Sequence, residues 1–170
     1  MRAGNENEHQ RRGAVNKAMG KMFEQRLDGA FAYYETHGMA IVEKTPEPIR
    51  AYKDLKDGRF LAVYTKKAQP DYKGVIKGGR AVMIEAKFTL TDRFTQDRVT
   101  PGQAEYMTKN EALGARCYVI VGFVAGGVYR IPWSVWSNMK DHFGRKYVKE
   151  TDLQGYRVKT AKNGALLVLH

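Results

Sequence analysis

Two carboxylates and one amine stand close together in this sequence, in a pattern that could hydrolyse phosphodiesters. Asp71 follows Pro70, and Glu85 and Lys87 end an apolar run that starts at Ala81. On a strand, residues two positions apart lie on the same face, so Glu85 and Lys87 would point the same way. Hydrolysis of a phosphodiester needs an activated water and stabilised negative charge, which a divalent cation held by carboxylates supplies. The pattern therefore predicts a metal-dependent nuclease.

Each of these groups has an expected role. Asp71 and Glu85 would bind the metal, and the carbonyl of Ala86 could add a further oxygen. Lys87 would orient the attacking water or stabilise developing negative charge. The alternative is an ordinary Glu–Lys pair at an exposed strand end. The preceding Pro-Asp, separated from the pair by Gly78-Gly79, favours the catalytic interpretation.

Glu24 is a further candidate for the catalytic site. It lies at the edge of the apolar stripe of an expected first helix, one turn after Gly20. A glycine on that side would permit close approach of the backbone, and the glutamate could then reach the sheet. The alternative is an ion pair of Glu24 with Lys21 or Arg26.

Gln103 has two possible roles. Thr100-Pro101-Gly102-Gln103 is typical of a helix start, with Thr100 as N-cap, Pro101 in the first turn and Gln103 completing a capping box. A side chain at that position could also meet the metal, one of its waters or a phosphate. We expect Gln103 to belong to the catalytic and metal-binding set, although capping alone would explain the pattern.

Hydrophobic spacing predicts an α/β fold in which helices pack on a sheet. Apolar residues recur at three- and four-residue steps over 14–37, and Gly38 is suited to end that helix. Strands at 72–77 and 80–87 are expected to form a hairpin, which would bring the carboxylates onto adjacent strands. The other expected elements are strands at 39–42, 117–123, 128–131, 157–160 and 165–169, a polar loop at 88–99, and helices at 101–114 and 132–143.

Residues 50–69 are expected to project from the core as a stalk. Asp57-Gly58 favours a tight turn between two short strands, and few residues nearby could be buried. Residues 50–80 carry nine Lys and Arg against three Asp, with aromatic residues between them. Basic and aromatic side chains suit phosphates and exposed bases. The expected DNA-binding residues are Lys53, Lys56, Arg59, Phe60, Tyr64, Lys66, Lys67 and Lys73.

Composition indicates a chain with a polyanionic partner. The net charge is +11, from 29 Lys and Arg against 18 Asp and Glu. The only cysteine, Cys117, lies in an apolar run and is expected to be inert core, and the four scattered histidines make zinc improbable. Residues 1–12 are expected to be a flexible basic arm before a single domain at 13–170. With no apolar run long enough for a membrane and no signal peptide, a cytoplasmic protein is expected.

The motifs together resemble a known family. Pro70-Asp71, Glu85-Ala86-Lys87 and Gln103 resemble the PD-(D/E)xK nuclease superfamily with its restriction-endonuclease-like core. Lys44–Ile49 and Asp71–Val75 resemble, in order, the RecU-type Holliday junction resolvases, over about residues 13–145. The resemblance implies a mixed sheet flanked by helices with a stalk, and a homodimeric, Mg²⁺- or Mn²⁺-dependent endonuclease that cuts four-way junctions symmetrically in DNA recombination and repair. It also implies metal binding by Asp71, Glu85 and Gln103, with Lys87 stabilising the transition state.

The chain departs from the family pattern at two places. The family commonly has threonine two residues before the aspartate, where this chain has Gln69. The N-terminal arm is also short, which suggests a phage-encoded form. Two other functions stay open: a restriction or repair endonuclease of the same superfamily, and a non-catalytic junction-binding protein that assists recombination.

Overall fold

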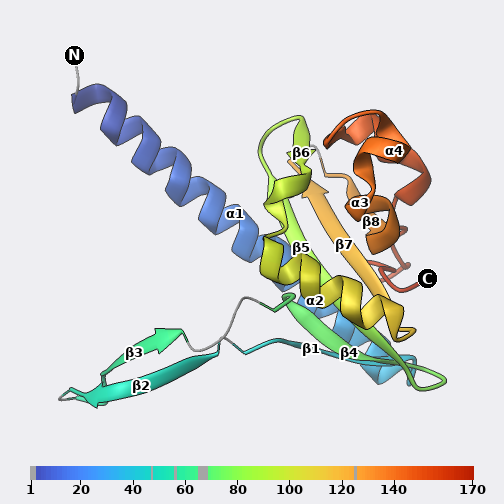
Figure 1. Cartoon of the computed structure of the whole chain (residues 1–170), viewed down its shortest axis with the longest axis horizontal. Helices are drawn as coiled ribbons and strands as arrows, with labels where there is room; N and C mark the ends of the chain where they lie inside the picture. The colour runs from blue at the N-terminus through green and yellow to red at the C-terminus, as the bar shows by residue number, and fades with distance from the viewer. Residues whose placement is uncertain (1–2, 47, 56, 65–68, 125) are drawn as a thin grey trace.

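The fold has three layers, with a central sheet between two layers of helices (Figure 1). The computed structural model describes the chain except residues 1–2, 47, 56, 65–68 and 125. The expected DNA contacts Lys56, Lys66 and Lys67 therefore lie outside the described residues. Within the described part of the chain, no helix has both the length and the apolarity needed to cross a membrane.

The central sheet is mixed and five-stranded, in the order β1-β4-β5-β7-β8. Its strands are β1 (Ala40–Lys44), β4 (Tyr72–Ile76), β5 (Arg80–Thr89), β7 (Arg116–Phe123) and β8 (Val128–Pro132). Only β5 and β7 pair in parallel, because α2 carries the chain from one to the other; the other pairs are antiparallel. The expected α/β class, the mixed sheet and the hairpin of β4 and β5 are confirmed.

The two faces of the sheet bury separate apolar clusters. Helix α1 (Ala3–Thr36) packs on one face, where its Phe23, Leu27 and Phe31 meet side chains such as Val82 and Ile84 of β5. The other face is covered by α2 (Pro101–Ala112), α3 (Trp133–Ser137) and α4 (Met139–Phe143), whose buried side chains are Gln103, Met107, Trp133, Val135, Trp136 and Met139. Cys117 lies in this second cluster, donates a hydrogen bond to the Met107 carbonyl, and is core as expected.

Helix α1 differs from its expected form at two places. It begins at Ala3, so the described part of the segment expected to be a flexible arm is helical. No proline interrupts residues 3–36, so the helix continues beyond its buried face. The expected close approach at Gly20 is wrong, because a Cβ atom there would have nothing within 4 Å.

The stalk is a hairpin with its own two-stranded sheet, which projects from the core in Figure 1. Strands β2 (Ile49–Asp54) and β3 (Phe60–Tyr64) pair antiparallel, and every residue of β2 is exposed. Asp57 and Gly58 both have positive φ, at 65° and 71°, as the tight turn between such strands requires. The expected projecting arm is confirmed.

The rest of the chain corrects several expectations. The expected loop at 88–99 contains β6 (Arg93–Thr95), paired with β9 (Tyr147–Lys149), and a 3₁₀ turn, and its Phe94 is buried in the core. Three-residue strands are too short to show alternation. The expected helix at 132–143 breaks at Asn138, whose amide donates to the Ser134 carbonyl and competes with the helical pattern.

The C-terminal tail also differs from the two strands expected there. Residues Glu150–Tyr156 form a 3₁₀ helix, and the described tail beyond it makes isolated bridges, Tyr129 with Arg157 and Thr160 with Leu166. Leu166 and Val168 are nevertheless buried against α1. Their apolar alternation reflects packing on a helix, which alone does not distinguish a strand from an extended tail.

Gly74 should be essential for the pairing of β1 with β4. A Cβ atom at Gly74 would lie 2.1 Å from the Ile41 carbonyl oxygen and 2.7 Å from the Val42 Cα. We therefore expect Gly74→Ala to lower the free energy of unfolding by about 2 kcal/mol or more in urea unfolding. Gly20→Ala, in open space on α1, is the matched control and should be neutral or stabilising by up to about 1 kcal/mol. Equal effects of the two changes would contradict this account of the sheet.

Candidate active site

The sheet register places three polar residues in one row across β1, β4 and β5. Lys44 pairs with Tyr72, and Tyr72 pairs with Ile84, so the next positions are Thr45, Asp71 and Glu85. The Thr45 N–H donates to the Asp71 carbonyl at 2.8 Å, which extends the ladder by one pair. Opposite residues of antiparallel strands point to the same face. The row therefore gathers its side chains on the face that α2 covers.

Glu85 is the most deeply buried member of this row, with 0% of the residue exposed. Its Oε1 accepts a hydrogen bond from Gln103 Nε2 at 2.7 Å and an ion-paired one from Lys87 Nζ. Its Oε2 is buried with no partner among the described residues. A carboxylate oxygen that is removed from water without a partner is costly, so this oxygen is suited to bind a cation or a hydrogen-bond donor.

Asp71 lies directly beside Glu85. The Ala86 N–H donates to Asp71 Oδ2 at 2.8 Å, which fixes the aspartate against β5. Burial raises the pKa of Asp71, and the Lys87 amine and the Ala86 N–H oppose that rise. Burial and the negative charge of Asp71 raise the pKa of Glu85 to about 7. Two carboxylates and one amine thus share a poorly hydrated space in which a further positive charge would be strongly stabilised.

The chemistry of this donor set fits a hard divalent cation. Among the described residues there is no cluster of three or more His, Cys, Asp and Glu side chains, as a zinc site would normally need. Mg²⁺ and Mn²⁺ instead accept a few carboxylate oxygens and keep several waters. Asp71 and the unpartnered Oε2 of Glu85 can supply those oxygens.

Gln103 makes the expected capping box and also bonds to Glu85. Its Oε1 accepts hydrogen bonds from the Thr100 N–H and hydroxyl, which completes the capping box of α2, while its Nε2 holds Glu85. With its oxygen on Thr100, the side chain acts in this geometry as a positioning group for Glu85. Direct binding of a metal by Gln103, as the resemblance implied, would require the amide to leave the capping box.

Glu24 lies near the row, but its hydrogen-bonding partner is elsewhere. Its carboxylate pairs with Lys44 Nζ, and not with Lys21 or Arg26 as the alternative had it. Its charge contributes to the raised pKa of Asp71, so it is electrostatically part of the site. In this geometry Glu24 is held by Lys44 on the α1 side of the sheet, opposite to the face of the two carboxylates.

Lys73 lies on the same face as Asp71, two residues further along β4. Its Nζ bonds to Gln69 Oε1 and stands 5.4 Å from the centre of the Tyr106 ring on α2. Gln69, at the position where the resemblance led us to expect threonine, therefore directs its amide oxygen to Lys73. Tyr106 was not expected at this place from the sequence, where its only signal is its position one turn after Gln103.

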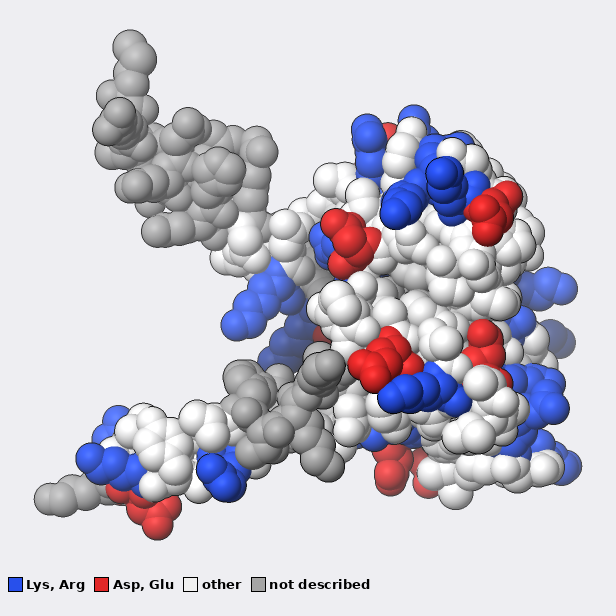
Figure 2. All heavy atoms as spheres, viewed as in Figure 1, with Lys and Arg blue, Asp and Glu red and all other residues white. Residues whose placement is uncertain are grey.

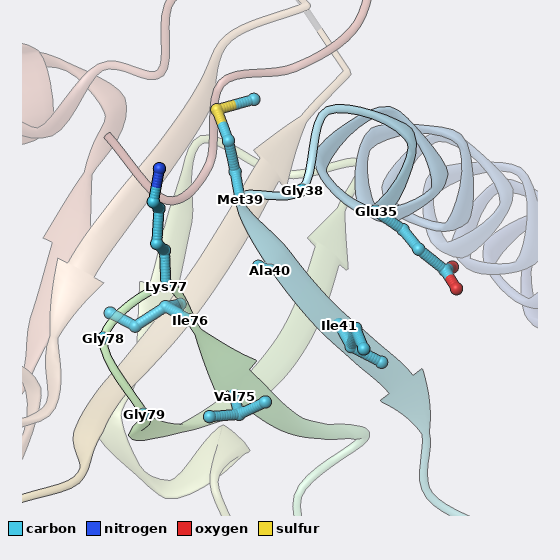
Figure 3. A pocket seen from close by; sticks show the side chains of 10 residues that line it. All are labelled: Glu35, Gly38, Met39, Ala40, Ile41, Val75, Ile76, Lys77, Gly78 and Gly79. Carbon is cyan, nitrogen blue, oxygen red and sulfur yellow. The ribbon is translucent and has the colours of Figure 1, made fainter.

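The other end of the same strands offers no comparable chemistry. A hollow lined by Met39, Ile41, Val75 and Lys77 lies beside the turn of β4 and β5 (Figure 3). Ile41 and Val75 are exposed and apolar. Glu35 is the one carboxylate among the residues that line this hollow. The candidate active site is therefore taken to be the group at the Asp71 end of the sheet.

Comparison with known proteins agrees with the motifs. A family model described as Recombination protein U matches residues 18–169. The chain belongs to the RecU family. A Pediococcus pentosaceus protein named Holliday junction resolvase RecU is 27% identical over 157 residues, which are 85% of this chain and 77% of that protein. A protein of the same name from Bacillus pumilus is 31% identical over 144 residues, which are 79% of this chain and 69% of that relative.

A solved structure is also similar in part. Hjc of Archaeoglobus fulgidus, a Holliday junction resolvase from an archaeal hyperthermophile, aligns with a TM-score of 0.46 and 15% identity, over 79% of this chain and 87% of that one.

The match to the RecU family begins at residue 18, within α1, and includes the stalk, Asp71, Glu85, Lys87 and Gln103. The resemblance stated from the sequence is confirmed.

The raised pKa of Glu85 makes metal-free stability depend on pH. The pKa of Glu85 is 4.5 in the unfolded chain and about 7 in the folded protein. Between these two pH values the folded protein holds a proton on Glu85 that the unfolded chain has lost. The free energy of unfolding should therefore fall as pH rises through this window, on the order of 2 kcal/mol more in the wild type than in Glu85→Gln. Urea unfolding in EDTA from pH 5 to 8 measures it. A constant difference between the two proteins across that range would refute the assignment, and Mg²⁺ should restore stability mainly at the alkaline end.

Proposed function

We propose that this protein is a metal-dependent endonuclease that resolves four-way DNA junctions by symmetric cleavage. The observation that carries the proposal is the fully buried Glu85, ion-paired with Lys87 and with one carboxylate oxygen unpartnered, beside the half-buried Asp71 in a chain of the RecU family. The cofactor that suits these oxygens is Mg²⁺, or Mn²⁺ in its place. The relatives' name as Holliday junction resolvases supports the substrate.

The side chains divide the work of phosphodiester hydrolysis among them. Asp71 and Glu85 would hold the cation, which when bound supplies Lewis acidity and lowers the pKa of water. Lys87 Nζ, already ion-paired to Glu85, would direct a proton-donating group toward the attacked phosphate and offset its growing negative charge. Gln103 would keep Glu85 in one orientation through its 2.7 Å hydrogen bond.

The stalk supports branched DNA as the substrate. Arg50, Lys53 and Arg59 are exposed on it, and so are the apolar or aromatic faces of Tyr52 and Phe60. Figure 2 shows basic side chains on this projection together with a few acidic ones. An exposed hairpin of this kind could make most contacts with DNA by entering the open centre of a junction, because phosphates and unstacked bases are both accessible there.

Lys73 is proposed to contact DNA at the site itself. It lies on the same sheet face as Asp71 and contacts Gln69 and Tyr106, so its charge would be available to a phosphate bound at that site. Tyr64 remains a proposed stalk contact on the strength of its type and position in β3.

A homodimer would match the symmetry of the substrate. Asp71 and Glu85 would give each chain one cation site, whereas resolution requires two nicks related by a two-fold axis. Two copies facing one junction would deliver both. The cytoplasmic location and the phage origin stay predictions.

Two other functions are distinguished by cleavage assays. A restriction or repair endonuclease would cut linear duplex as well as junctions, whereas a resolvase should prefer a mobile four-way junction over linear and Y-shaped DNA of the same sequence. A non-catalytic accessory protein would bind junctions without Mg²⁺-dependent cutting. The Asp71, Glu85 and Lys87 arrangement favours the enzyme.

Asp71→Asn should separate binding from catalysis. The change keeps the size of the side chain but removes a charged metal ligand, so we expect Mg²⁺-dependent cleavage to fall by about a hundredfold or more. Junction binding in EDTA should stay within about threefold of the wild type, because phosphate contacts dominate affinity. Gel-shift and cleavage assays on one labelled junction measure both. Unchanged cleavage would remove Asp71 from the proposed site.

Charge reversal on the stalk should weaken junction binding. For the double variant Lys53→Glu and Arg59→Glu we expect about tenfold weaker binding. The slope of the logarithm of the binding constant against that of the salt concentration should fall by an amount equivalent to up to about two phosphate contacts. Lys140→Glu with Lys162→Glu changes the net charge equally at exposed positions in the C-terminal part of the chain. Fluorescence anisotropy at several salt concentrations compares the two. If both variants lose equal affinity, net charge rather than the stalk explains junction binding.

A further inference from the structure

The hydroxyl of Thr45 is a second buried polar group without a partner. Among the described residues, the buried side-chain atoms that lack a hydrogen bond are Thr45 Oγ1, Glu85 Oε2 and Arg145 Nε. A hydroxyl withdrawn from water ordinarily bonds to a protein group or a bound water. An unpaired hydroxyl therefore calls for a physical reason.

Two of these three atoms belong to residues of the same row. Thr45 is the position after Lys44 in the β1–β4 ladder, and its N–H donates to the Asp71 carbonyl at 2.8 Å. Thr45, Asp71 and Glu85 therefore occupy successive strands at one level of the sheet. Lys44 points to the other face, where it meets Glu24 on α1, so Thr45 points to the face of the two carboxylates.

The side chains around the row do not satisfy this hydroxyl. Asp71 Oδ2 accepts from the Ala86 N–H, and Glu85 Oε1 is occupied by Gln103 and Lys87. Gln69, where the resemblance led us to expect a threonine, bonds instead to Lys73. A hydroxyl and a carboxylate oxygen are thus both left open at one level of the sheet.

We propose that Thr45 is a positioning residue of the divalent-cation site, whose hydroxyl gains its hydrogen-bonding partner only when the cation and its waters are bound. The inference rests on the proposed function, because it assumes that Asp71 and Glu85 hold such a cation. An unpartnered hydroxyl on the same sheet face as two carboxylates suits the waters that Mg²⁺ and Mn²⁺ retain. Partners of this kind orient the ligands of a metal and tune its affinity.

The proposal predicts opposite effects on stability and on cation binding. Thr45→Val replaces the hydroxyl by a methyl group of similar size, so the metal-free protein should unfold at the same or a higher temperature, because an unsatisfied buried hydroxyl is removed. Its affinity for Mn²⁺ should fall about tenfold. Thr45→Ser keeps the hydroxyl and should bind Mn²⁺ within about threefold of the wild type.

The experiment combines thermal unfolding in EDTA with calorimetric titration of Mn²⁺ into the full-length wild type, Thr45→Val and Thr45→Ser. The inference fails if Thr45→Val binds Mn²⁺ as the wild type does, or if Thr45→Val destabilises the metal-free protein, since the hydroxyl would then have had a partner without the cation. An affinity lost equally in Thr45→Ser would also overturn it, because shape rather than the hydroxyl would be responsible.

Asp71→Asn distinguishes failure of this inference from failure of the proposed site. If the wild type binds Mn²⁺, Asp71→Asn does not, and Thr45→Val binds normally, the site stands and only the role of Thr45 is wrong. If Asp71→Asn binds Mn²⁺ as tightly as the wild type, or if the wild type binds none, both proposals fall.

Discussion

The burial of a carboxylate in the middle of a sheet is the constraint on which the rest of this structure depends. Glu85 is fully removed from solvent on the central strand β5, a position that would ordinarily hold an aliphatic side chain. Its charge is compensated from two directions, by Lys87 on its own strand and by Gln103 on α2. The neighbouring Asp71 adds to the negative charge instead of relieving it. A cation bound between the two carboxylates would offset this excess negative charge.

The fold supplies this geometry through register and layering. The antiparallel pairing of β4 with β5 places Asp71 beside Glu85, and the pairing of β1 with β4 adds Thr45 to the row. Helix α1 and its apolar partners anchor the opposite face, so the strands that carry the site have little freedom to shift. Close approach at Gly74 holds β1 against β4. A rigid sheet is an appropriate support for chemistry that depends on small distances.

Helix α2 joins the fold to the site through one residue. Gln103 uses its oxygen to cap the helix and its nitrogen to hold Glu85, so the start of α2 and the orientation of the carboxylate are linked. The stalk differs, since none of its described residues belongs to either apolar cluster. The described side chains of its two strands are exposed, and the basic and aromatic ones among them suit nucleic acid. In the proposed function the core positions the reaction and the stalk selects the substrate.

Much of this arrangement could be read from local patterns. The hairpin of β4 and β5, the turn at Asp57-Gly58, the cap at Thr100 and the common face of Glu85 and Lys87 all follow from short-range rules of backbone conformation and strand alternation. The short pair of β6 and β9 did not follow, nor did the break at Asn138 or the helical residues before 14. The strand pair and the helix break depend on how distant segments pack together. The early start of α1 depends on there being no proline to interrupt a polar stretch of helix.

Residue types and spacing were enough to identify the chemical groups of the site: two carboxylates, an amine and an amide, in a basic chain whose motifs belong to the RecU family. Which atoms of these groups have hydrogen-bonding partners and which have none depends on the folded chain. It paired Glu24 with Lys44, directed Gln69 to Lys73, and left Glu85 Oε2 and Thr45 Oγ1 without partners among the described residues. The physical reason is that hydrogen-bond satisfaction depends on the register between strands and on burial, which residues distant in the chain decide together.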